Sequence, residues 1–82
     1  MIIMSDTPTP DVEIDSRGAA CPGPLMDLIG KVKEVDAGTT IELLTSDEGS
    51  KNDVPEWLEE AGHELLEVQA EDDYWAIYIE TT

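Results

Sequence analysis

The single cysteine of this chain, Cys21, is the nucleophile that the sequence offers. It follows the small residues Gly18, Ala19 and Ala20, and it directly precedes Pro22 and a segment whose apolar residues recur at helical spacing. Unpaired backbone N–H groups and the helix dipole favour an anion at such a place. A helix start of this kind lowers the pKa of a thiol below its ordinary value of about 8.5. The sequence therefore predicts a reactive, exposed thiol.

A lone cysteine more often serves as a small buried hydrophobe. The prolines Pro22 and Pro24 favour the exposed thiol instead, because they stiffen the backbone around the sulfur and remove N–H donors from the first turn. A Cys–His dyad would have to use His63, the only histidine, and no third residue is identifiable that would orient it. We therefore expect His63 to be a structural residue at the end of a helix.

Metal and cofactor chemistry find little support in the sequence. One cysteine and one histidine form no cluster of soft ligands. Residues 47–53 resemble a calcium-binding loop only superficially, since Lys51 stands where a ligand should be. We expect no metal and no cofactor. The chemistry that remains is that of a one-thiol carrier, which accepts a group on sulfur and passes it to a partner.

The first half of the chain predicts a strand, a helix and a second strand. Residues 11–15 alternate between polar and apolar, as in a half-buried strand. Residues 25–35 show the apolar spacing of one helix face, with Pro22 and Pro24 in the first turn and Gly38 as the residue that closes the helix. Residues 40–45 again have the pattern of a strand.

The second half predicts a helix followed by two strands. After a polar loop over 46–52, Asp53 and Glu56 resemble a capping box that starts a helix, which ends at Gly62. Strands follow at 64–70 and 74–80. Because the strands mostly alternate, one sheet face is expected to be solvated while both helices cover the other. This is a two-layer α/β sandwich of order β-α-β-α-β-β, and its open face carries Tyr74 and Tyr78, as ordinary sheet residues or as part of a partner surface.

Composition indicates a folded but very acidic chain. The 82 residues include 20 acidic and 4 basic side chains, for a net charge of −16, while 40% are hydrophobic. We expect a flexible N-terminal tail over 1–10 and a single domain over 11–82. The charge argues against direct nucleic-acid binding and against anionic membranes, and it fits a halophilic host, with an ordinary acidic protein as the alternative.

Residues 1–4 lack the features of a secretory signal, no apolar run is long enough to span a membrane, and a lone cysteine forms no disulfide within the chain. These features indicate a cytoplasmic protein, which we expect to be a monomer.

Four motifs stand in order along the chain: Asp15-x-x-Gly18-x-x-Cys21-Pro22-x-Pro24-Leu25, Asp47-x-Gly49-Ser50, Asp53-Val54-Pro55-x-Trp57 and Gly62-His63-Glu64-Leu65. Together they carry a resemblance to the TusA/SirA-like sulfur carrier family, which covers about residues 11–80. It implies a four-stranded mixed sheet with two helices. It also implies that Cys21 carries sulfur as a persulfide, with Asp15, Gly18, Pro22 and Pro24 as supporting motif residues.

The same resemblance implies partners for a sulfurtransferase: a cysteine desulfurase or another sulfurtransferase as donor, and a downstream acceptor in tRNA thiolation, molybdenum cofactor synthesis or other sulfur metabolism. Family members often carry basic residues along the first helix, whereas this chain has only Lys31 and Lys33 there. The rival hypothesis is a non-catalytic interaction or regulatory module of the same fold.

Overall fold

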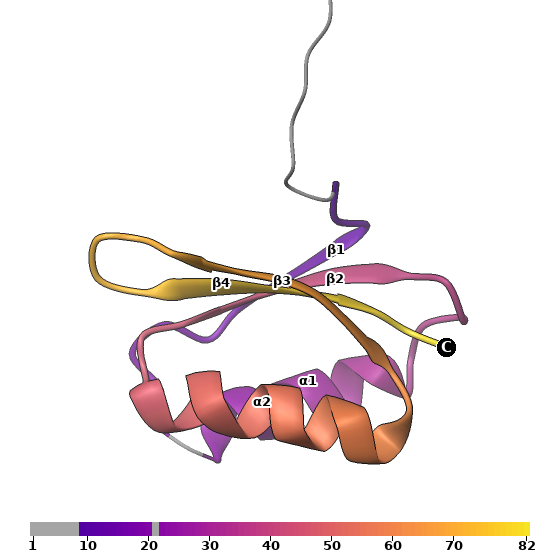
Figure 1. Cartoon of the computed structure of the whole chain (residues 1–82), viewed down its shortest axis with the longest axis horizontal. Coiled ribbons are helices and arrows are strands. Elements are labelled where there is room, and N and C mark those ends of the chain that lie inside the picture. Colours follow the sequence, from indigo (N-terminus) through magenta and orange to yellow (C-terminus); the bar gives the residue numbers. More distant parts are fainter. Residues whose placement is uncertain (1–8, 21) are drawn as a thin grey trace, which may run out of the picture.

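The structure, a computed structural model, describes residues 9–20 and 22–82. The elements follow the predicted order, and Figure 1 shows both helices on the same face of the sheet, so the two-layer α/β sandwich is confirmed. Most of the expected tail over 1–10 lies outside the described residues. The bounds of the elements are β1 Val12–Asp15, α1 Gly23–Val32, β2 Thr40–Thr45, α2 Glu48–Ala61, β3 Glu64–Ala70 and β4 Trp75–Glu80.

The four strands form one mixed sheet in the order β1-β2-β4-β3. β1 pairs with β2 in parallel, while β4 pairs antiparallel with both β2 and β3. The parallel pair requires a crossover, and α1 provides it. The connection that follows β1 and leads into α1 contains the cysteine position. β3 and β1 are the two edges of the sheet.

The main core lies between the sheet and the helices. Alternation along β2 turns Ile41 and Leu43 toward the helices, as the sequence predicted, and both are fully buried. Leu28 of α1 and the α2 residues Val54 and Leu58 pack against them. The helices are therefore held in place by the apolar stripes that the spacing predicted.

The open face of the sheet carries a second, smaller buried cluster of Leu44, Ala76 and Tyr78. Tyr78 is only 4% exposed, and its hydroxyl donates to Oε2 of Glu42 at 2.5 Å. Tyr78 is thus an ordinary buried sheet residue, the first of the two roles that the sequence left open. Tyr74 is half-buried and packs against this cluster.

The predicted end of the first helix at Gly38 is wrong. α1 ends at Val32, and Gly38 lies in the later turn that leads into β2. The φ of Gly38 is +89°, and its N–H donates to the carbonyl of Thr81 at 2.7 Å. The left-handed conformation that favours glycine here serves a turn tied to the C-terminal segment instead of a helix terminus.

The predicted start of the second helix at Asp53 is also wrong. α2 begins at Glu48, with Asp47 as its N-cap. The Asp47 carboxylate accepts from the Ser50 backbone N–H at 2.8 Å and from the Ser50 hydroxyl at 2.9 Å. The capping residue is therefore the earlier aspartate, and Asp53 lies inside the helix. The predicted end at Gly62 is confirmed, because Gly62 is the C-cap with a φ of +85°.

Candidate functional site

Cys21 itself lies outside the described residues, so the site is built from the residues on either side of it. Pro22 is the N-cap of α1, with φ −94° and ψ 18°, and no side chain caps the helix. The Gly23 N–H donates to the Ala20 carbonyl at 2.8 Å, and the Met26 N–H donates to the Pro22 carbonyl at 2.8 Å. The chain therefore makes a tight turn as it enters the helix.

This turn leaves few donors for an anion. Pro22 and Pro24 have no N–H, and the N–H of Gly23 is already bonded to Ala20. None of these three described residues can donate to an anionic sulfur. The favourable field at the start of α1 then comes from the helix dipole, and no acidic side chain lies in the first turn to neutralise it.

The loop over 16–20 packs against the first turn of α1. A Cβ on Gly23 would lie 3.2 Å from the Cβ of Ala19, which is tighter than an ordinary contact. Pro24 is buried and fixes the first turn on the core. Two of the predicted support residues, Pro22 and Pro24, thus determine where α1 starts and how it sits on the sheet.

Two hydrogen bonds hold this loop to the rest of the fold. The buried Ser16 donates its hydroxyl to Oδ2 of Asp27 on α1 at 2.7 Å. The Gly18 N–H donates to the hydroxyl of Ser46 at 2.9 Å, and Gly18 has a φ of +89°, which favours glycine. The predicted support residue Gly18 therefore shapes a loop that is anchored to both α1 and the end of β2.

The predicted support residue Asp15 lies at the end of β1 and binds Arg17. The guanidinium donates to both carboxylate oxygens, at 2.9 and 2.8 Å, and the Arg17 N–H donates to Oδ1 at 3.1 Å. The side-chain hydrogen bond from Arg17 lowers the pKa of Asp15 to about 2, and the same bond raises the pKa of Arg17. Arg17 also lies 5.0 Å from the centre of the Tyr74 ring, next to the β3–β4 hairpin.

The surface next to the cysteine position is small and uncharged. Ala20 and Pro22 are exposed, and Met26 exposes 58% of its surface although it is a large apolar residue. The sequence from Ala19 to Met26 contains no acidic or basic side chain. Such a surface suits contact with another protein better than capture of a charged small molecule.

His63 follows the end of α2, which lies at the far end of the helical layer from the start of α1 (Figure 1). Its ring is 5.6 Å from that of Trp57, and its Nδ1 accepts from the Thr82 N–H at 3.1 Å. His63 thus ties the end of α2 to the C-terminal residue. This is the structural role at a helix end that the sequence favoured over a Cys–His dyad.

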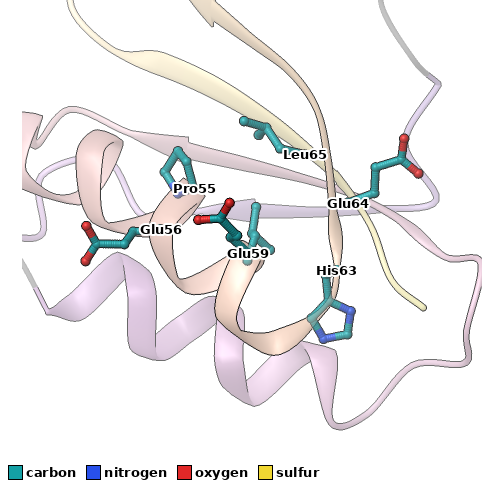
Figure 2. A pocket seen from close by; sticks show the side chains of 7 residues that line it. Pro55, Glu56, Glu59, His63, Glu64 and Leu65 are labelled. Atoms are coloured by element: carbon teal, nitrogen blue, oxygen red, sulfur yellow. The ribbon is translucent and has the colours of Figure 1, made fainter.

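A pocket of about 580 Å³ lies between α2 and β3, and Figure 2 shows several side chains that line it, among them Pro55, Glu59 and Leu65. None of the predicted site residues that the structure describes, Asp15, Gly18, Pro22 and Pro24, lines it. The pocket is therefore separate from the predicted sulfur site.

Within residues 9–20 and 22–82, no group of three or more histidine, cysteine or acidic side chains is arranged to hold a metal ion. No helix in the same part of the chain is long and apolar enough to cross a membrane.

Sequence reasoning missed the residues that anchor the loop, namely Ser16, Asp27 and Ser46. Asp27 gave no distinctive signal, because an acidic side chain near the start of a helix is common whether or not it has a side-chain partner. The two serines gave none, since a short polar side chain between two elements fits any surface loop.

Comparisons with known proteins agree with this geometry. A model of the family "Sulfurtransferase TusA" matches residues 12–81. A protein of Archaeoglobus fulgidus named "Putative sulfur carrier protein" is 53% identical over 68 residues, which cover 83% of this chain and 93% of the relative. The "Sulfur carrier protein TusA" of Pseudomonas syringae is 37% identical over 70 residues, covering 82% of this chain and 83% of the relative.

A solved structure adds the fold. The crystal structure of a SirA-like protein from Desulfitobacterium hafniense superposes with a TM-score of 0.75 at 21% identity, covering 84% of this chain and 95% of that one. It has the same α/β fold with an open four-stranded sheet and two helices. The family model and the curated relatives show that the chain belongs to the TusA family of sulfur carrier proteins.

Proposed function

We propose that this protein carries sulfur as a persulfide on Cys21 and relays it between two partner proteins. Membership of the sulfur carrier family supports a sulfur-handling role. The single observation that supports Cys21 as the carrier is its place in the chain: the only cysteine directly precedes an α1 start without a side-chain cap or an acidic first turn. An anionic sulfur is stabilised at such a helix start.

The loading step is a thiol exchange that needs no external oxidant. The Cys21 thiolate attacks the outer sulfur of a donor protein's persulfide, R–S–SH, so that a bond forms between Sγ and that sulfur. The S–S bond of the donor breaks, and its electron pair leaves on the donor thiolate. The products are R–S⁻ and a Cys21 persulfide that keeps the proton on its outer sulfur. Unloading repeats the same step with the thiolate of an acceptor.

The surface around the cysteine position supports protein partners on both sides of this relay. Ala20, Pro22 and Met26 offer an exposed apolar contact without charge, and such a contact admits the loop of another protein. We propose a cysteine desulfurase or another sulfurtransferase as donor, and a protein of tRNA thiolation, molybdenum cofactor synthesis or other sulfur metabolism as acceptor. The net charge of −16 argues that any nucleic acid is reached through that acceptor. We place the relay in the cytoplasm, where a lone thiol stays reduced.

The test is to incubate the protein with a cysteine desulfurase and cysteine and to measure its mass. We expect the wild type to gain the mass of one sulfur atom, which dithiothreitol then releases as sulfide. Cys21→Ser should gain nothing.

A matched control separates the site from any exposed thiol. Combining Cys21→Ser with Glu60→Cys moves the single thiol to an exposed position on α2. We expect this variant to load at least about tenfold more slowly, because its thiol lacks the helix start and the apolar surface. Equal loading of the wild type and this variant would argue against a dedicated carrier site and favour an interaction module.

A further inference from the structure

β3 is an edge strand with exposed apolar side chains. In the described part of the chain it pairs with β4 alone, so the backbone groups along its other side have no strand partner. Leu65 and Val68 of this strand are 40% and 38% exposed. Their cross-strand partners are Ile79 and Ile77, which belong to the core on the helix side. The exposed apolar groups therefore extend the helix-side face of the sheet beyond the cover that the helices give.

This part of the sheet borders the pocket between α2 and β3. Figure 2 shows Leu65 of β3 and Pro55 of α2 on either side of it, with Glu59 between them. The register between β3 and β4 breaks between Leu65 and Glu67 and is regular from there to Ala70. An added strand would thus pair along residues 67–70, where its side chains on the helix side would meet Val68, and Leu65 lies just beyond the paired residues, at the pocket.

Charge determines which strand can bind here. The exposed glutamates Glu56, Glu59 and Glu64 line the pocket, and Glu67 lies on the open face of the same strand. A second copy of this chain would bring its own acidic residues, with a net charge of −16, against this edge. Like charges that face each other across strands are destabilising. The edge therefore disfavours self-pairing and is complementary to a basic segment.

We propose that the edge of β3 and the adjoining pocket form a docking site for an extended segment of a partner protein, in which apolar residues alternate with Lys or Arg. The segment adds a strand to β3 with its apolar side chains on the helix side against Val68 and Leu65. Its alternate basic side chains lie on the open face near Glu67, and basic side chains of the residues that continue past Leu65 reach Glu56, Glu59 and Glu64 at the pocket. The pocket lies at the end of the helical layer away from the start of α1 (Figure 1), and β3 is the sheet edge opposite β1, from which the cysteine loop continues, so a docked segment leaves the cysteine position accessible. The proposal does not depend on the sulfur relay.

The test uses the wild-type protein, labelled with ¹⁵N, and a synthetic peptide of the same length as β3, seven residues, in which Val and Lys alternate. The peptide ends are acetylated and amidated. We expect amide shifts and slower hydrogen exchange confined to β3 and the end of α2. A control peptide with Glu in place of Lys should not bind. Shifts centred on β1, the other sheet edge, or an absence of binding would overturn the proposal.

Two triple variants test the charge complementarity, and each removes three exposed negative charges. The first is Glu56→Gln, Glu59→Gln and Glu64→Gln at the pocket; the matched control is Glu13→Gln, Glu48→Gln and Glu60→Gln elsewhere on the surface. We expect the pocket variant to weaken peptide binding about tenfold, as three partly exposed ion pairs would predict, and the control to change it less than about twofold. If both triple variants weaken peptide binding equally, the peptide is attracted by the net charge alone, and the proposal is contradicted.

Apolar contact is tested by the double variant Leu65→Thr and Val68→Thr, which keeps strand-forming residues on the edge. We expect binding to weaken by about tenfold, because two apolar contacts are lost. Unchanged binding would contradict the proposed strand pairing. A second copy of the chain is the other segment that could occupy this edge, and sedimentation of the wild type without peptide tests for it. If the wild type forms a dimer and the same double variant abolishes the dimer, the edge binds a second copy and the proposal is overturned.

Discussion

The two helices of this protein begin in opposite ways. α2 starts at a capping carboxylate, since Asp47 accepts from both the backbone N–H and the hydroxyl of Ser50, and Glu48 adds a second acid in the first turn. α1 starts at Pro22 without a side-chain cap and without an acid in its first turn. The positive end of the dipole is thus neutralised by the chain's own carboxylates in α2 and left without them in α1.

Under the proposed function, this difference separates a helix start that stabilises the fold from one that receives an anionic sulfur. A capping carboxylate at α1 would add stability, yet it would place a fixed negative charge next to the sulfur. The prolines start the helix by a different means, since their φ is already suited to a first turn and they lack the N–H that a cap would satisfy. Although the chain has 20 acidic residues, none falls between Ala19 and Met26.

The largest expected effect comes from removing the α2 cap. Asp47→Ala deletes both bonds to Ser50, and we expect the free energy of unfolding to fall by about 1–2 kcal/mol. Urea denaturation measures this loss. Sulfur loading of the folded variant should stay at the wild-type rate, because the cap belongs to the other helix.

The matched control is Asp53→Ala, which removes the residue that the sequence pattern identifies as the cap. We expect its free energy of unfolding to fall by less than about half as much as that of Asp47→Ala, because Asp53 lies inside α2 and alanine is the better helix former there. A larger loss at Asp53 than at Asp47 would reverse this assignment of the cap.

These two aspartates also show where sequence reasoning reached its limit. Asp53 precedes Glu56 by three residues and fits the spacing of a capping box, whereas Asp47 is followed at the same interval by Ser50, which does not complete that pattern. Gly49 and Pro55 made the later start look better, because both residues are poor in helix interiors. The choice depends on the tertiary position of β2, which ends at Thr45 and delivers the chain to Asp47. Such information is not local.

Other features of the fold show the same difference between what the local sequence determines and what depends on distant contacts. The apolar alternation of Ile41 and Leu43 predicted the sheet face correctly, because burial enforces a strict period of two. The end of α1 could not be predicted, since the contact that gives Gly38 its role comes from Thr81, far away in sequence. The role of Cys21 stays a prediction from its neighbours, and the Ser16–Asp27 bond that anchors its loop could not be predicted because it depends on how the loop after β1 packs against α1.

The next effect in size comes from giving α1 the cap that it lacks. Pro22→Asp places a carboxylate at the N-cap, and we expect alkylation of Cys21 by iodoacetamide at neutral pH to slow by about two- to fivefold, because the added charge disfavours the thiolate. Persulfide loading should slow in parallel. Stability should rise or stay the same, as measured by urea denaturation.

Pro22→Asn distinguishes charge from capping, since asparagine caps a helix about as well as aspartate. We expect the Asn variant to react faster than the Asp variant. If both variants slow the alkylation of Cys21 equally, the rigidity of the proline matters more than the absence of charge. The difference between the two helix starts would then have no electrostatic basis.

The smallest effect concerns Asp15, an acid in the segment that leads to α1 but held by Arg17 instead of the helix. Arg17 lowers the pKa of Asp15 to about 2, so this ion pair contributes to stability in full above the ordinary aspartate pKa of about 4 and loses its contribution as pH falls toward 2. Because both side chains are exposed, the loss in stability is expected to be small.

NMR titration of the carboxyl carbons should give a midpoint near 2 for Asp15 in the wild type. In Arg17→Gln the midpoint should return toward about 4. If the Asp15 midpoint stays low in Arg17→Gln, the positive end of α1 must already attract this carboxylate. In that case both helices would have a carboxylate near their N-terminus, and the electrostatic difference between α1 and α2 would be smaller.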